Sequence, residues 1–309
     1  MSVVMYREPQ LENPEMLCSW PGIGNIGLIA VDTLRGQLKA RELGQIEPWD
    51  YFEPHKVFIQ KGMLEELWFP RSRFFYHERG EKDLLFFTGE EQPGGREKVY
   101  AYGEKAYRMA ENVVEVARKH GCRRIYTSGA CVSMTHHQVK PRVVAVTSSE
   151  KLNRELKRYP NLVTMSELGE GGGEGVITGM NGLMLAVAKK KGLEAVCLMG
   201  EIPDWLARVP FPYTKASKSV LEVFGSIFGL DTRPGLLDRQ SAEVDRVIES
   251  FYEKFPEEVK EIYDQRKTEA KPVPISEKEA EWMKENLDEF LKSLTDEQEK
   301  GDDNGDRPI

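Results

Sequence analysis

The chain is poor in cysteine and has no cysteine pair at metal-binding spacing. Its 309 residues include four cysteines, Cys18, Cys122, Cys131 and Cys197, which lie far apart and form no C-x-x-C motif. Cys18 and Cys197 stand within apolar runs typical of buried strands, where a thiol serves as a small apolar side chain. We therefore expect reduced thiols and no structural zinc or other metal site.

The sequence also lacks long apolar runs and an excess of basic residues. No apolar run is long enough to cross a bilayer, and the first residues, MSVVMYREPQLENPE, lack the basic start and apolar core of a signal peptide. The formal net charge is −8 at pH 7, whereas binding to a nucleic-acid backbone needs a basic face. The mean hydropathy of −0.50 is typical of a soluble globular protein. We expect a cytoplasmic protein that binds neither a membrane nor nucleic acid.

The usual catalytic sets are missing as well. The segment GACVSMTHHQ carries Ser133 and the adjacent His136 and His137 after a predicted strand, but it has no G-x-S-x-G elbow and no assignable acidic partner for a histidine. Adjacent histidines point in different directions on regular structure, so a shared metal is not expected. We interpret this segment as a polar loop with exposed histidines, and we expect no catalytic residues and no cofactor.

Three glycines at the spacing G-x-G-x-x-G stand where an apolar run changes into a predicted helix. Residues 18–31, CSWPGIGNIGLIAV, place Gly22, Gly24 and Gly27 at a junction where α/β proteins bind ligands. Pro21 leads into the turn, and no acidic residue ends a second strand about 20 residues later, as a dinucleotide site requires. A turn that lets helix and strand pack closely is therefore favoured over a phosphate cradle.

Predicted strands and helices alternate along the first 240 residues. Short β-branched and aromatic runs predict strands of a mixed sheet at 57–59, 64–69, 73–76 and 84–87, and further strands at 124–127, 143–147 and 195–199. Apolar spacing predicts helices over 97–120, after Ser149 as an N-cap, over 181–191 and over 213–228. This repetition implies a largely parallel sheet with helices on both faces, so we expect one three-layer α/β/α domain over residues 1–240.

A second glycine-rich segment, residues 169–182, precedes the helix predicted at 181–191. Glu170 and Glu174 within it would repel a phosphate. Glu201, at the end of a predicted parallel strand, is the acid best placed to face a crevice at the sheet edge. The alternative function is thus a small-molecule enzyme or a nucleotide or nucleoside binder. Its candidate crevice residues are Gly22, Gly24, Asn25, Gly27, Gly179, Asn181, Gly182 and Glu201.

The sequence changes character after Asp238. An apolar stripe predicts one or two helices there, with Pro256 in the first turn of the second. Ser276 and Glu279 then form a capping box, which is followed at heptad-like spacing by Met283, Leu287, Phe290 and Leu294. That stripe needs to be buried on its own domain or on a partner protein, and the spacing leaves both open. We expect a helical extension over 241–295 and a disordered acidic tail over 296–309.

Several blocks, taken in order, resemble the archaeal and bacterial form of the proteasome assembly chaperone 2 family. They are WPGIGNIGLIA (20–30), FFTGEEQP (86–93), GCRRIYTSGA (121–130), KPRVVAVT (140–147), ITGMNGLML (177–185), EAVCLMGEIP (194–203) and ASKSVLEVFGSIFGLD (216–231). The resemblance implies a fold like that of the purine nucleoside phosphorylases. It also implies a non-catalytic role in binding proteins and assembly as a homo-oligomer.

The resemblance further implies a partner, the α subunits of the proteasome. Archaeal relatives engage the α ring through a C-terminal hydrophobic-tyrosine-any tripeptide, whereas this sequence ends Arg307, Pro308, Ile309, so docking through that motif is not expected. The leading hypothesis is a self-associating, non-catalytic scaffold that assists assembly of a protein complex, with the C-terminal helices as its contacts.

Overall fold

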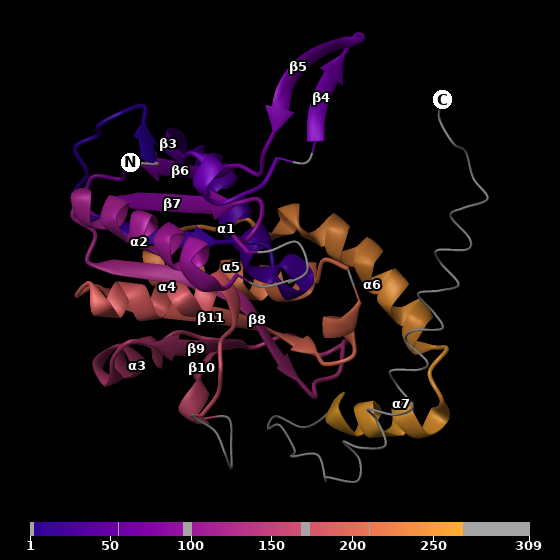
Figure 1. Ribbon diagram of the computed structural model, residues 1–309. Helices are drawn as coiled ribbons and strands as arrows, with labels where there is room; N and C mark the ends of the chain where they lie inside the picture. The colour runs from indigo at the N-terminus through magenta and orange to yellow at the C-terminus, as the bar shows by residue number, and fades with distance from the viewer. Residues whose placement is uncertain (1–2, 55, 95–100, 168–173, 210, 268–309) are drawn as a thin grey trace.

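A nine-stranded mixed sheet lies between two layers of helices (Figure 1). The computed structural model describes residues 3–54, 56–94, 101–167, 174–209 and 211–267. The strands stand in the spatial order β1 (Val3–Met5), β3 (Arg41–Ile46), β6 (Ser72–His77), β7 (Leu84–Gly89), β2 (Glu15–Ser19), β8 (Arg124–Ser133), β11 (Glu194–Pro203), β9 (Val143–Thr147) and β10 (Leu162–Thr164).

The centre of the sheet is parallel and its flanks contain antiparallel pairs. Strands β7, β2, β8 and β11 run parallel, whereas β6 is antiparallel to β7 and β9 is antiparallel to β11. A parallel neighbour needs a long crossover connection. The short segments 78–83 and 134–142 contain no helix and are shorter than the roughly dozen residues that such a crossover needs. The sheet is therefore mixed, as expected for the strands predicted at 73–76 and 84–87, whereas the largely parallel arrangement predicted from the alternation of elements is found only at its centre.

Helices cover both faces of this sheet, as expected from the sequence. Helices α1 (Ile26–Gln37) and α5 (Thr214–Phe228) pack together on one face, and α2 (Gly103–Lys119) and α4 (Gly179–Lys190) pack together on the other. Each face has its own apolar core, which includes Trp205 and Phe224 in the first case and Trp20 and Phe74 in the second. The predicted α/β fold with helices on both faces is confirmed.

Two predicted helix starts can be compared with the structure. Helix α3 (Glu150–Leu156) begins after Ser149, whose Oγ accepts a hydrogen bond from the N–H of Leu152 at 3.4 Å, so the predicted N-cap is confirmed. The helix predicted over 97–120 begins at Gly103 as α2, and residues 97–100 lie outside the described part of the chain. In the described residues, no helix combines the length and apolar character that a membrane span requires.

Two further helices follow α5 at the carboxyl side of the described chain. Helices α6 (Asp238–Tyr252) and α7 (Glu257–Asp264) contribute Ile248, Phe251 and Val259 to the same apolar core as α5. Pro256 is the N-cap of α7, one position before its first turn. The predicted partner-binding stripe, Met283, Leu287, Phe290 and Leu294, lies outside the described residues.

The strands β4 (Lys56–Gln60) and β5 (Met63–Trp68) form a separate antiparallel hairpin. In Figure 1 it projects as a purple arm away from the main sheet and its helices. Lys61 and Gly62 at its tip have φ values of 51° and 77°, as the tight two-residue turns of hairpins require. The sequence predicted strands here correctly, but it assigned them to the main sheet, which they do not join.

Candidate functional site

A crevice of about 380 Å³ opens at the carboxyl ends of β2, β8 and β11, beside the starts of α1 and α4. Its wall is mostly apolar and includes Trp20, Ile23, Val132 and Met199. The polar side chains on the wall are those of Gln92, Thr178, Asn181 and the cysteines Cys131 and Cys197. Within the described part of the chain, no charged side chain lines this crevice.

The structure brings three of the predicted crevice residues together on the wall: Gly22, Gly27 and Asn181. Four others do not line the crevice: Gly24 and Asn25 lie in the turn before α1, and Gly179 and Gly182 lie in the first turn of α4. The predicted residues of the two glycine segments therefore come from the starts of α1 and α4, and only some of them line the crevice.

Close backbone packing explains two of these glycines. A Cβ on Gly27 would stand 2.2 Å from the carbonyl oxygen of Ser128 in β8. A Cβ on Gly182 would stand 2.2 Å from the carbonyl oxygen of Ile177. Both distances are far below van der Waals contact, so only glycine allows this approach. The geometry supports the interpretation that the glycines serve packing.

Gln92 links the two helix starts, and the sequence analysis missed it. Its Nε2 donates to the carbonyl oxygen of Pro21 at 2.6 Å, and its Oε1 accepts from the N–H groups of Ala101 and Met180 at 3.0 and 3.1 Å. The N–H of Met180 in the first turn of α4 is therefore already occupied by a side-chain oxygen. Gln92 lies in the block FFTGEEQP (86–93), and nothing in the neighbouring residues predicts its hydrogen bonds to the two helix starts.

Glu201 does not line the crevice. It is 2% exposed, and the guanidinium of Arg142, just before β9, holds its carboxylate through two bonds, Nη2 to Oε1 at 2.7 Å and Nε to Oε2 at 2.8 Å. The backbone N–H of Arg142 donates to the same Oε2 at 3.1 Å. This bidentate pair neutralises the carboxylate and ties the start of β9 to β11.

The two crevice thiols are poor nucleophiles. Burial, with the nearby charge of Glu201, raises the pKa of Cys131 to about 11. Burial also raises the pKa of Cys197 to about 12. Because the thiolate is the reactive form, both cysteines are unreactive near neutral pH. All four cysteines of the chain are free in the structure.

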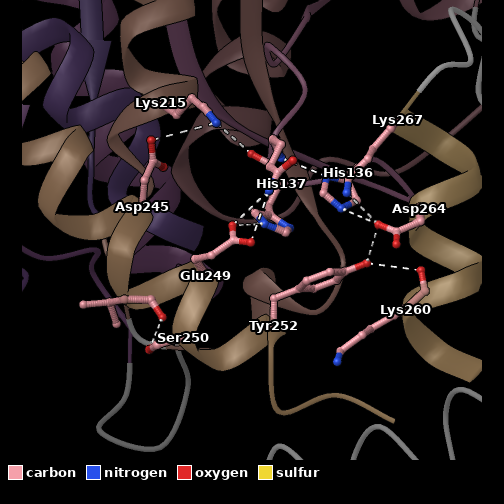
Figure 2. A network of polar contacts seen from close by, with 12 residues as sticks. His136, His137, Lys215, Asp245, Glu249, Ser250, Tyr252, Lys260, Asp264 and Lys267 are labelled. Carbon is pink, nitrogen blue, oxygen red and sulfur yellow. Dashed lines mark hydrogen bonds and ion pairs between the residues drawn. The ribbon is translucent and has the colours of Figure 1, made fainter. Parts of the chain in front are cut away.

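His136 and His137 form a buried cluster, so the expectation of an exposed loop is wrong. Their exposed fractions are 0% and 4%, and their ring centroids lie 4.2 Å apart. The segment 134–142 has no regular structure, which allows adjacent rings to stack, and Tyr252 of α6 packs against both. Figure 2 shows that most of the residues around the rings come from α6 and α7, and that Lys215 of α5 also approaches His137.

Polar contacts of the histidine cluster join α6 and α7 to the loop after β8. Nε2 of His137 lies 2.9 Å from Oε2 of Glu249 in α6, and Nε2 of His136 lies 3.2 Å from Oδ1 of Asp264 in α7 (Figure 2). Nδ1 of His136 accepts from the N–H of Gln138 at 3.0 Å, which places the ring proton of the neutral form on Nε2, facing Asp264.

Burial keeps both histidines neutral near pH 7. It lowers the pKa of His136 to about 4, and the neighbouring His137 and Lys267 act in the same direction. Burial also lowers the pKa of His137, although Glu249 opposes the shift. Among the residues that the structure describes, no group of histidine, cysteine and carboxylate side chains is arranged to hold a metal ion. The contacts of the two histidines join the loop after β8 to α6 and α7.

Comparison with known proteins places this geometry in a family. The model of the PAC2 family matches residues 16–251. The chain is 29% identical over 250 residues to the uncharacterised protein MJ1210 of Methanocaldococcus jannaschii, which covers 81% of this chain and 86% of that protein.

Two solved structures from Pyrococcus furiosus have similar folds. PbaB, described as an archaeal proteasome activator, has a TM-score of 0.66 and 26% identity, and the match covers 80% of this chain and 97% of PbaB. PbaA, described as an archaeal homologue of proteasome-assembly chaperone, has a TM-score of 0.60 and 20% identity, with 87% and 99% covered. The family model runs from β2 into α6, so the chain belongs to the PAC2 family.

Proposed function

We propose that the chain is a non-catalytic, self-associating scaffold that binds proteins and assists the assembly of a protein complex. Membership in the PAC2 family supports this role. So does the likeness to PbaB, which is described as a proteasome activator and shares 26% of its aligned residues with this chain. The proposed partners are proteasome α subunits, and the proposed compartment is the cytoplasm.

The chemistry of the crevice is the observation that carries the proposal. An enzyme built on this fold would place an acid, a base or a nucleophile at the carboxyl ends of its strands. The described wall instead offers protonated thiols, and the nearby Glu201 is neutralised by Arg142. A hollow with this lining favours a scaffold over an enzyme.

The proposed partner-binding element is the heptad-like stripe beyond the described residues. It consists of Met283, Leu287, Phe290 and Leu294, which follow α7 and the 3₁₀ turn at Gln265–Lys267. In this proposal residues 1–240 form the scaffold domain, residues 241–295 form the extension that reaches the partner, and the acidic segment 296–309 is a tail.

Binding to purified archaeal proteasome α subunits tests the proposal. We expect saturable binding in biolayer interferometry, with at least tenfold weaker binding after the double substitution Leu287→Asp and Phe290→Asp, because charges in the stripe prevent its burial. Glu285→Ala, on the opposite side of the expected helix, serves as the control and should bind like the wild type. Absence of binding to α subunits by the wild-type chain would contradict the proposed partner.

A further inference from the structure

The β4–β5 hairpin exposes apolar side chains on both of its faces. The members with 42–70% of their surface exposed are Val57, Phe58, Ile59, Met63, Leu64 and Leu67. Together they present on the order of 600 Å² of apolar surface, divided between the two faces of the hairpin, and exposed apolar surface of this extent is typical of interaction sites. A two-stranded hairpin standing alone is also marginally stable in water. This arm therefore has the composition of an element that is covered in an assembly.

The outer edge of β4 is suited to pairing with a second copy of itself. Within the described chain, β4 and β5 bond only to each other, so each has an unpaired outer edge. Antiparallel pairing of KVFIQ about Phe58 sets Phe58 opposite Phe58 and Val57 opposite Ile59 of the second copy. It brings no like charges opposite one another, and apolar cross-strand pairs of this kind stabilise sheets.

The outer edge of β5 is less suited to such pairing. Its centre carries two adjacent glutamates, Glu65 and Glu66, and antiparallel self-pairing there would bring glutamates of the two copies together. Charged residues on an edge strand block open-ended association. Pairing through β4 with β5 outermost therefore gives a closed pair of arms instead of a fibre.

Charge balance also favours a second copy at the arm. Residues 56–68 contain two lysines and two glutamates, whereas the whole chain carries a net charge of −8. Two acidic copies therefore repel each other least when they meet through their neutral arms. Pairing through β4 brings together chiefly Val57, Phe58 and Ile59 of the two copies, so the buried area lies below about 1,200 Å², the lower limit for specific stable interfaces, and the association should be weak and depend on concentration.

We propose that the β4–β5 hairpin is the self-association arm of this protein and that its occupant is the hairpin of a second copy. The two β4 strands pair antiparallel about a two-fold axis at Phe58, which gives a four-stranded sheet in the order β5-β4-β4-β5. The inference rests on the self-association included in the proposed function, and it names the surface that produces it.

A charge-swap experiment in sedimentation velocity tests the arm with the full chain. We expect the wild type to associate as its concentration rises, and Phe58→Glu and Phe58→Lys each to associate at least tenfold more weakly, since like charges then meet at the axis. An equimolar mixture of the two variants should recover association, because opposite charges then face each other. Leu236→Glu, which places a charge at another exposed apolar position, is the control and should associate like the wild type.

Each outcome decides a different part of the proposal. If the wild type is a monomer at every concentration, both the arm and the self-association are overturned, while binding to α subunits stands on its own test. If the wild type associates and both Phe58 variants match it, the arm is overturned and another surface mediates association. If the two Phe58 variants associate weakly and their equimolar mixture associates no better, pairing of β4 with β4 is overturned. Circular dichroism spectra equal to that of the wild type show that the variants are folded.

Discussion

At the start of α1, the presence or absence of a single carbon atom decides how closely the helix packs on the sheet. The missing side chain of Gly27 lets α1 rest directly on the backbone of β8 at Ser128. On β11, Glu201 is held by Arg142 and does not line the crevice. At this scale, Gly27 serves the packing of helix on strand, and Glu201 ties β11 to the start of β9.

Two glycines in α1 give a matched test of this packing. Gly27→Ala should lower the free energy of unfolding by about 1–3 kcal/mol, because the added methyl group overlaps the carbonyl oxygen of Ser128. Gly36→Ala meets no atom within 4 Å and should raise the free energy of unfolding by about 0.5–1 kcal/mol through helix propensity. Urea unfolding followed by circular dichroism measures both. Equal effects of the two substitutions would contradict the close-packing account.

The pair of Arg142 with Glu201 gives a second residue-scale prediction. Arg142→Ala should destabilise the protein by about 3 kcal/mol at pH 7, because it leaves a carboxylate that is 2% exposed without its cation. Lys140→Ala removes the surface pair with Glu222, in which the lysine side chain is 62% exposed, and should cost less than about 1 kcal/mol. Similar losses in urea unfolding would show that the buried pair is no stronger than a surface pair.

At the scale of elements, α6 and α7 are attached to the sheet through the histidine cluster. Aromatic and polar contacts join the loop after β8 to Glu249 and Tyr252 in α6 and to Asp264 in α7. These two helices lead to the segment that we propose binds the partner. The state of the cluster therefore bears on how firmly that segment is anchored.

Acid should loosen this attachment. The pKa of His136 is about 4 in the folded protein and 6.5 without burial, so between these values the unfolded chain binds more protons than the folded one. Stability is then fully present above pH 6.5 and falls as the pH drops toward 4, by up to about 3 kcal/mol. Urea unfolding at pH 7, 5.5 and 4.5 measures this dependence.

Variants separate the cluster from general acid effects. His136→Gln should flatten the decline of stability between pH 7 and 4.5, because its amide does not titrate. His120→Gln, at the end of α2 and outside the cluster, should leave the decline as steep as in the wild type. An unchanged decline in His136→Gln would show that this histidine does not cause it.

Local patterns were sufficient for some elements and insufficient for others. The strand predicted at 143–147 matches β9, and the helix predicted over 213–228 matches α5 apart from its first residue, because both have a clear apolar period. The strand β3, RELGQI, has mostly polar residues and was not predicted. The histidine cluster joins residues far apart in sequence, such as His137 and Glu249 at a separation of 112 positions, so no local pattern could reveal it.

The whole molecule combines a sheet covered by helices on both faces with a projecting hairpin arm. The sheet and its helices bury two apolar cores, and the arm of β4 and β5 stands outside both (Figure 1). The crevice at the centre of the strand ends was predictable in place, since α/β folds open there, but its uncharged lining depends on residues from segments distant in sequence. At this scale the covered sheet forms the body of the molecule, and the exposed hairpin projects from it.

The most direct test of this account is the rate at which separately purified archaeal proteasome α and β subunits assemble into core particles, with and without the chain. The account predicts that the wild type raises the rate or yield of assembly, that Leu287→Asp with Phe290→Asp loses the effect, and that no added metabolite is consumed. An unchanged assembly rate, together with steady conversion of a small molecule that stops on substitution of a crevice residue, would contradict it.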